Sequence, residues 1–169
     1  GGLSKLDIVS GKWTSYNRFK ESIKSHATGA IDPIRDLLVV TEFQYNGKNP
    51  RVLVRDLAYP DEPYVIINTS GDTEIEDAMH AKLGFEWVPS LKKFVAWSSG
   101  SSLYYLTLPN KHWRTEDWVW KRVELSGKVP IDPYAGPSGK FQVVPDLDIA
   151  LVITKRTDSV YAVRLKNTD

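Results

Sequence analysis

Five acidic side chains between Asp72 and Glu86 have the chemistry for glycoside hydrolysis, which needs two carboxyl groups that face each other. They are Asp72, Glu74, Glu76, Asp77 and Glu86. The same segment also fits a solvated acidic loop or the start of a short helix, because Thr73 and Glu76 have the spacing of a capping box. Asp77 is a candidate ligand-binding residue, and the sequence assigns no catalytic residue.

Two histidines stand just before predicted strands, His26 in "SHATG" and His80 in "MHAKLG". An imidazole can both donate and accept hydrogen bonds, so two roles suit histidines at corresponding places. In one interpretation they line a shared polar channel and bind a ligand. In the other they hydrogen-bond neighbouring strands and are structural. Both histidines are therefore candidate ligand-binding residues.

The segment "NKHWRTEDWVW", from Asn110 to Trp120, is the densest mixture of aromatic and charged side chains in the chain. Trp113 and Arg114 are candidate ligand-binding residues there, because Trp and Arg are enriched among the residues that dominate binding surfaces. The alternative is that Trp113 caps the edge of a sheet. Trp118 and Trp120 lie in a predicted strand, and one of them is expected in the core.

Composition excludes several other kinds of site. The 169 residues include no cysteine, so disulfides, thiolate catalysis and cysteine-ligated zinc are excluded. Three histidines limit other metal sites, and we expect neither a metal nor a cofactor. Lys and Arg number 22 against 21 Asp and Glu, which gives a net charge of +1. A nucleic-acid partner is not expected, because a large phosphate-binding surface needs a basic excess.

The proportion of apolar and charged residues is that of an ordinary globular domain with a core. Apolar residues make up 41% of the chain and charged residues 25%. No run approaches the roughly 18 apolar residues of a membrane span, and the first residues have no signal-peptide core. We expect a soluble protein without a membrane partner, and the compartment, secreted or cytoplasmic, stays open.

Three prolines, Pro33, Pro89 and Pro145, follow one another at intervals of 56 residues. At each of them an apolar run leads into a proline turn and a second apolar run leads out of it. The three stretches are "AIDPIRDLLVV", "FEWVPSLKKFVA" and "FQVVPDLDIALV". Three matches in one register indicate an internal repeat. We therefore expect the prolines in equivalent turns between the first two strands of three repeats.

Further alternating strands follow each proline turn. Third strands are predicted at "RVLVRDL", "SLYYLTL" and "SVYAVRL", and fourth strands at "PYVIIN" and "WVWKRVEL". Four-stranded meanders of this kind stack and share a core that one meander alone cannot bury. The strand number and the period are typical of β-propeller blades. The predicted fold class is all-β, with about three blades per chain.

The chain, residues 1–169, is predicted to be a single propeller-like domain. Its repeats cover approximately residues 18–70, 71–126 and 127–169. Residues 3–17 have the pattern of two strands joined at Ser10 and Gly11, and we expect them to complete a neighbouring blade.

These features resemble kelch and galactose-oxidase-like β-propellers. A blade of that family has a His before its first strand, a small-residue turn after its second, a Tyr on its third and a Trp on its fourth. The matching features here are His26 and His80, the turn "WSSGSS", Tyr104 or Tyr105 and Tyr161, and Trp13 and Trp118 or Trp120. The resemblance implies a partial propeller. It does not carry over copper chemistry, which uses a cysteine-crosslinked tyrosine that this chain cannot form.

Assembly follows from the number of repeats, because closed propellers usually have at least four blades. Either missing sequence supplies the remaining blades, or copies of this chain combine. The simplest homo-oligomer is a dimer in which the strand of Trp13 adds to the strand that ends at Leu165 of its partner.

Function remains open between two classes. The sequence favours a non-catalytic interaction or ligand-binding module with a protein or carbohydrate ligand, because no nucleophile, base and orienting group come together. The alternative is a carbohydrate-active propeller, either a glycoside hydrolase or a lectin-like protein. A propeller fold does not decide between them.

Overall fold

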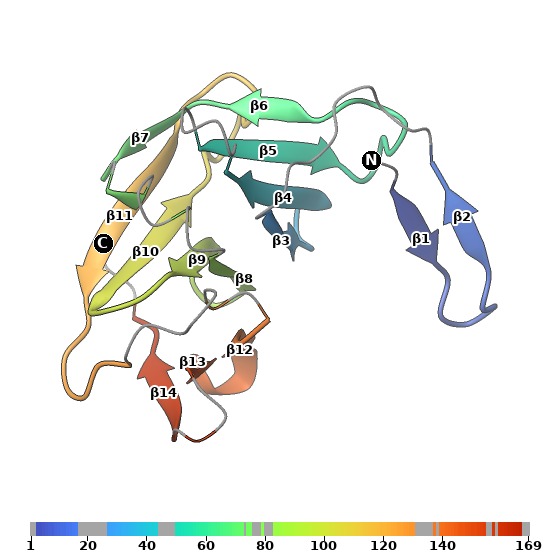
Figure 1. The fold of residues 1–169 in the computed structure, drawn as a ribbon. Coiled ribbons are helices and arrows are strands. Elements are labelled where there is room, and N and C mark those ends of the chain that lie inside the picture. Colours follow the sequence, from blue (N-terminus) through green and yellow to red (C-terminus); the bar gives the residue numbers. More distant parts are fainter. Residues whose placement is uncertain are drawn as a thin grey trace.

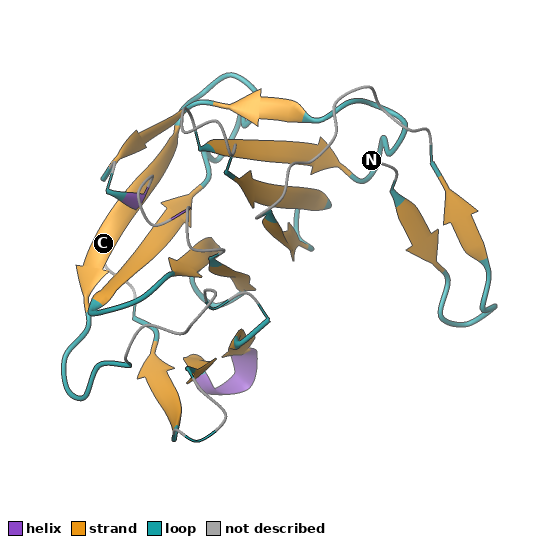
Figure 2. Ribbon diagram, viewed as in Figure 1, coloured by secondary structure: helices purple, strands orange, loops and turns teal. Residues whose placement is uncertain are grey.

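The structure is a computed structural model of the chain, and it describes residues 3–16, 27–43, 50–72, 74–75, 79, 83–130, 137, 139–154, 157 and 159–166. Over these ranges the fold is all-β, with open sheets in which most neighbouring strands are antiparallel (Figure 1, Figure 2). The predicted all-β class is therefore confirmed.

The first sheet is an antiparallel meander in which each strand pairs with the next one along the chain. Its strands are β3 (Thr28–Asp32), β4 (Leu37–Glu42), β5 (Arg51–Asp56) and β6 (Val65–Ile67). Apolar and β-branched residues dominate β4 and β5, as suits a pleated buried surface. Glu42 at the end of β4 is buried, and the Arg51 Nε, opposite it on β5, donates to its Oε1 at 2.8 Å. This pairing offsets the cost of burying the carboxylate.

The second sheet repeats the meander and adds one strand. Its strands are β8 (Gly84–Val88), β9 (Lys93–Trp97), β10 (Ser102–Thr107) and β11 (Trp118–Glu124), with β7 (Thr69–Gly71) at the edge. The added strand runs parallel to β11, with Thr69 opposite Trp118. Because β7 follows β6 after a single residue, Asn68, it ties the first sheet to the outer edge of the second.

The third sheet has three strands and a short 3₁₀ helix in its first turn. They are β12 (Phe141–Val144), η2 (Pro145–Leu147), β13 (Ile149–Ile153) and β14 (Val160–Arg164). One edge of β14 pairs with β13, and no described strand pairs with the other edge.

A separate hairpin precedes these sheets, formed by β1 (Ser4–Leu6) and β2 (Trp13–Ser15). In its turn, Asp7 Oδ1 accepts the backbone N–H groups of Val9 at 2.9 Å and Ser10 at 2.8 Å. These hydrogen bonds favour the ionised carboxylate and hold the pKa of Asp7 below its ordinary value. The predicted strand pair is therefore present. Trp13 is exposed on the hairpin.

The first hairpin of each sheet has the same register, and the prediction about the prolines is confirmed. Pro33, Pro89 and Pro145 each lie in the turn between the first two strands. The equivalent cross-strand pairs, each shifted by 56 residues, are Ile31 with Leu38, Trp87 with Phe94, and Val143 with Ala150. The residue three positions after each proline has a positive φ near 50°, and these residues are Asp36, Lys92 and Asp148. The repeat is therefore one of backbone conformation as well as of sequence.

Two apolar cores lie between the three sheets. The second sheet contributes to both, because alternate residues of a strand point to opposite faces. The first core, between the first and second sheets, includes Val39, Val54, Phe85, Phe94, Leu106, Trp118 and Trp120. The second core, between the second and third sheets, includes Val88, Val95, Trp97, Tyr105, Phe141 and Val152. The sequence predicts one of Trp118 and Trp120 in the core, and the structure places both there. Two residues apart on a strand, they share a face and are both buried.

The sheets follow one another in an arc, as Figure 1 shows, with their first strands toward the inside. The strand β8 of the second sheet contacts β3 of the first and β12 of the third. Side-by-side first strands and face-to-face sheets are features that a propeller would share. No described helix is long and apolar enough to cross a membrane.

Candidate functional site

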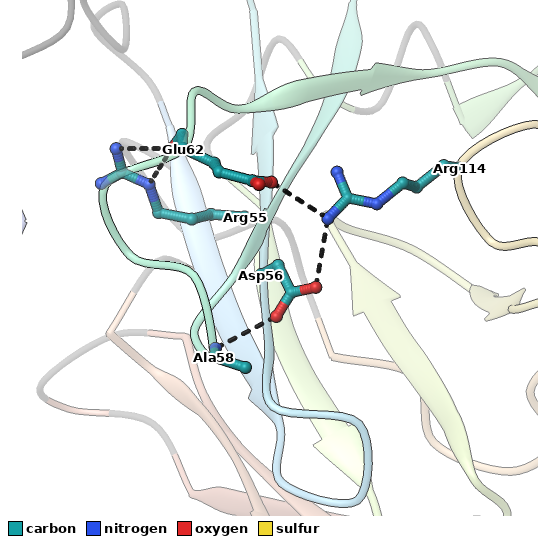
Figure 3. A network of polar contacts seen from close by, with 5 residues as sticks. All are labelled: Arg55, Asp56, Ala58, Glu62 and Arg114. Atoms are coloured by element: carbon teal, nitrogen blue, oxygen red, sulfur yellow. Dashed lines mark hydrogen bonds and ion pairs between the residues drawn. The ribbon is translucent and has the colours of Figure 1, made fainter.

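The strongest cluster of charged and aromatic side chains lies where two loops meet at the rim between the first and second sheets. One loop, residues 57–64, connects β5 to β6, and the other, residues 108–117, connects β10 to β11. The Arg114 guanidinium of the second loop reaches across to the first (Figure 3). Its Nη2 is 3.1 Å from Asp56 Oδ2 and 3.3 Å from Glu62 Oε2. One cation therefore bridges two carboxylates from the neighbouring repeat.

The 57–64 loop is folded so that both carboxylates face Arg114. Asp56 Oδ1 accepts the Ala58 N–H at 3.0 Å, and the Glu62 N–H donates to the carbonyl oxygen of Tyr59 at 2.9 Å. Behind the loop, the buried Arg55 donates from Nε and Nη2 to the Glu62 carbonyl oxygen at 3.3 and 3.2 Å (Figure 3). These contacts fix the loop before any ligand is present, which lowers the entropy cost of binding.

Aromatic rings support both arginines. The Arg114 Cζ lies 4.4 Å from the centre of the Trp113 ring, and the Arg55 Cζ lies 4.6 Å from that of Tyr64. Both distances are within the range of cation–π attraction. Burial raises the pKa of the Tyr64 hydroxyl, and the nearby positive charge of Arg55 partly opposes that rise.

Trp113 is half-buried rather than free on the surface. It packs against the first core, and its carbonyl oxygen accepts the Trp118 Nε1–H at 2.9 Å. The structure therefore brings together Trp113 and Arg114, both singled out from the sequence, with the ring as support and the guanidinium as the polar group at the surface.

Tyr59 is the aromatic side chain that the loops leave open. It is 61% exposed and lies in the loop between Asp56 and Glu62. Sequence reasoning missed Tyr59 and both carboxylates as site residues. The available signal was the turn-rich stretch "AYPDEPY", residues 58–64, which places Tyr59 and Glu62 on one loop shortly after Asp56. We call Asp56, Tyr59, Glu62, Trp113 and Arg114 the loop cluster.

The remaining sequence candidates are three ligand-binding residues and the acidic segment. His26, Asp77 and His80 lie outside the described residues. Of the acidic segment, Asp72 Oδ2 accepts the backbone N–H of Arg122 at 2.6 Å, and Glu74 forms an ion pair with the Arg122 side chain. These two carboxylates thus hold β11.

Glu86 lies apart from Asp72 and Glu74, half-buried on β8 at the opposite edge of the second sheet. Burial raises the pKa of its carboxyl above the ordinary value of 4.5. It points to the same face of β8 as Val88, toward the third sheet. Its side chain therefore does not share the surface position of Asp72 and Glu74.

A groove of about 340 Å³ lies on the outer side of the second core. Its walls come from β10, β11, the 125–130 segment and β14, and include Leu103, Tyr105, Val123, Lys128, Tyr161 and Arg164. The groove lies beside the open edge of β14, where the first and second sheets each have a fourth strand.

Metal binding and relatedness add no further assignment. In the part of the chain that the structure describes, no three His, Asp or Glu side chains gather closely enough to hold a metal ion. No family model, curated protein or solved structure matches the chain.

Proposed function

We propose that the chain is a non-catalytic binding module built from β-propeller blades, with the loop cluster as its ligand-binding surface. The loop cluster carries this proposal. Its exposed Tyr59 ring lies on the loop between two residues whose carboxylates share one cation, and hydrogen bonds have already ordered this loop. A few fixed polar groups beside an aromatic surface are typical of ligand sites.

The propeller part of the proposal is supported by three features. The hairpins repeat in one register, the sheets stack face to face, and the first strands β3, β8 and β12 lie side by side. They are consistent with the resemblance to kelch and galactose-oxidase-like propellers, whose blades are arranged in this way.

A non-catalytic role fits the chemistry of the loop cluster. Hydrolysis of a glycoside needs one carboxyl as an acid and a second carboxylate that is free to act as base or nucleophile. Asp56 and Glu62 instead share one guanidinium, which holds both carboxylates in ion pairs. The cluster is therefore suited to holding polar groups of a ligand rather than to moving protons.

The test is a glycan array run beside a panel of glycoside substrates, with the full chain. Binding without turnover supports the proposal. We expect Tyr59→Ala and Arg114→Ala to abolish this binding. Trp13→Ala is the matched control, because Trp13 is 67% exposed but lies on the separate hairpin. Turnover of a glycoside would favour a carbohydrate-active enzyme, and binding that survives both loop variants would place the ligand elsewhere.

A further inference from the structure

The outer edge of β14 has backbone groups that no described strand uses. The Leu165 N–H donates to the carbonyl oxygen of Asp148 at 2.8 Å, and successive residues of an antiparallel strand direct these groups to opposite sides. Val163, two residues earlier, therefore bonds to β13 as well, whereas Ala162 and Arg164 direct their N–H and C=O groups to the free edge. Both residues are exposed. An edge of this kind is a template for one more strand.

The groove beside β14 follows this edge rather than one face of the third sheet. Four consecutive residues, 161–164, line it, and consecutive residues of a strand point to both faces. Its volume of about 340 Å³ is at the small end of the range for ligand sites. Its floor is the apolar face of the second sheet, formed by Leu103, Tyr105, Val123 and Leu125. The free edge therefore has space beside it for the side chains of an added strand.

The second sheet shows how a fourth strand would lie on β14. There Trp120 of β11 is opposite Leu106 of β10, and it is buried between two sheets. Leu106 corresponds to Val163, because each pairs with the residue five positions after the proline of its repeat. A strand added to β14 would therefore place its side chain opposite Val163 over the floor of the groove. The next side chain, opposite Arg164, would lie on the outer face.

Positive charge predominates around the groove. Lys128, Arg164 and Lys166 line it beside a single carboxylate, that of Glu124. Glu124 already forms an ion pair with Arg122. Opposite charges that face each other across two strands stabilise their pairing. An added strand with acidic side chains on its outer positions is therefore favoured here.

The chain's own hairpin, whose strand of Trp13 the sequence predicted to add to β14 of a second copy, matches this charge poorly. From β1 to β2 it carries Lys5 and Lys12 against one carboxylate, that of Asp7. Lys12 directly precedes Trp13, so this strand would bring a positive charge to a positive groove. Charge complementarity selects a segment of a different protein instead.

We propose that β14 binds an extended segment of a partner protein as its fourth strand, one in which acidic residues alternate with aromatic or large apolar residues. Backbone hydrogen bonds to Ala162 and Arg164 hold the segment. Its apolar side chains lie over the groove floor, and its acidic side chains face Arg164 and Lys166. Strand addition of this kind takes its affinity from the backbone and its specificity from alternate side chains.

Calorimetric titration of the full chain with a capped heptapeptide, Glu-Trp-Glu-Trp-Glu-Val-Glu, tests the charge preference. The control peptide has Lys in place of each Glu. We expect the acidic peptide to bind at least about tenfold more tightly than the basic one. Arg164→Glu should weaken binding of the acidic peptide about tenfold, because an attractive pair becomes a repulsive one. Lys5→Glu, at an exposed position of β1, is the matched control and should change the affinity less than about twofold.

Ala162→Pro tests whether the peptide pairs with the backbone. Proline removes the N–H that faces the free edge, and an edge strand tolerates it there because β13 does not use that N–H. We expect the variant to bind the acidic peptide at least about tenfold more weakly, whereas Ala162→Ser, which keeps the N–H, should bind it as the wild type does. An unchanged thermal midpoint should show that both variants fold, and Arg164→Glu keeps the test decisive if the proline variant does not.

Several results would overturn the inference. They are equal affinities for the acidic and basic peptides, no binding of either, and binding of the acidic peptide that Arg164→Glu and a folded Ala162→Pro both leave intact. Light scattering on the wild type addresses the chain's own hairpin. A dimer that becomes a monomer in Trp13→Ala would mean that this hairpin occupies the edge of β14, and it would overturn the inference as well.

Discussion

The junctions on either side of the second sheet are closed by different means. At the first junction, between the first and second sheets, aromatic packing in the core continues outward to the Arg114 ion pairs at the rim. At the second junction, between the second and third sheets, Trp97 stacks on Phe141 and Ser90 hydrogen-bonds Asp148 near the inner strands. Its outer side holds the groove beside β14.

The difference shows what a fourth strand contributes to this fold. Where β6 and β11 are present, the space between sheets is filled from the inner strand to the outer one. Where no described strand follows β14, the inner half is packed by residues such as Trp97, Phe141 and Val152, but the outer half holds the groove. The inner hairpins are therefore sufficient for neighbouring sheets to stack. The outer strands fill the remaining space between the sheets.

The largest effect is expected from Phe85→Ala in the first junction. Phe85 stacks on Phe94 with ring centres 5.1 Å apart and lies 6.5 Å from Trp120. Removing a large buried aromatic should cost about 3 to 5 kcal/mol of unfolding free energy. Chemical denaturation measures this, with the exposed Ile34→Ala as control, for which a change within about 0.5 kcal/mol is expected. An unchanged denaturation midpoint for Phe85→Ala would show that the packing at the first junction does not stabilise the fold.

A smaller cost is expected from Gly84→Ala in the second junction. A Cβ on Gly84 would lie 2.3 Å from the Cβ of Phe141, so β8 and β12 would have to separate. Forcing extra volume into such a contact should cost about 1 to 3 kcal/mol.

A double-mutant cycle identifies the cause of that cost. In the Phe141→Gly background the Gly84→Ala cost should fall, because both the Cβ and the ring that the new methyl group would contact are gone. An equal cost in both backgrounds would show that the lost stability comes from the altered backbone of β8 itself. The close approach of β8 and β12 would then not contribute to the stability of the second junction.

The smallest effect is expected from Glu86→Gln, and it depends on pH. Since burial raises the folded-state pKa of Glu86, its ionisation disfavours the folded state. Its contribution to stability is full below the ordinary pKa of 4.5 and is lost as the pH rises through the folded-state pKa. Gln removes that loss, so the variant should melt at a higher temperature than the wild type at about pH 7.5 and at the same temperature at about pH 3.

The third repeat provides an internal comparison for Glu86, because Gln142 occupies the equivalent position there. A lower melting temperature for Glu86→Gln at neutral pH would mean that the carboxylate makes a stabilising contact. The second junction would then depend on a charge, as the rim of the first one does.

The parts of the fold that sequence predicted are the local ones. A proline turn between two alternating runs brings together residues that are close along the chain, so Pro33, Pro89 and Pro145 were sufficient to place three hairpins. The strand β7 was missed because Thr69–Gly71 has no alternating pattern and its partner β11 lies far along the chain.

The candidate site was only half predicted for the same reason. Trp113 and Arg114 are conspicuous in one short segment, but Asp56 and Glu62 reach Arg114 only because two sheets stack. No spacing in the sequence encodes that meeting. The burial of Trp113 likewise depends on the neighbouring sheet and not on its own segment.

The chain contains the same turn three times, with Asp36, Lys92 and Asp148 at the equivalent position. Each has a left-handed backbone at the same step of the same turn, although none is a glycine. The Lys92 turn lies between the other two in the arc, and the three differ in their neighbours rather than in their conformation. A glycine introduced at each site in turn would measure one conformational cost three times within a single protein, and the scatter among the three values would be the influence of the surroundings alone.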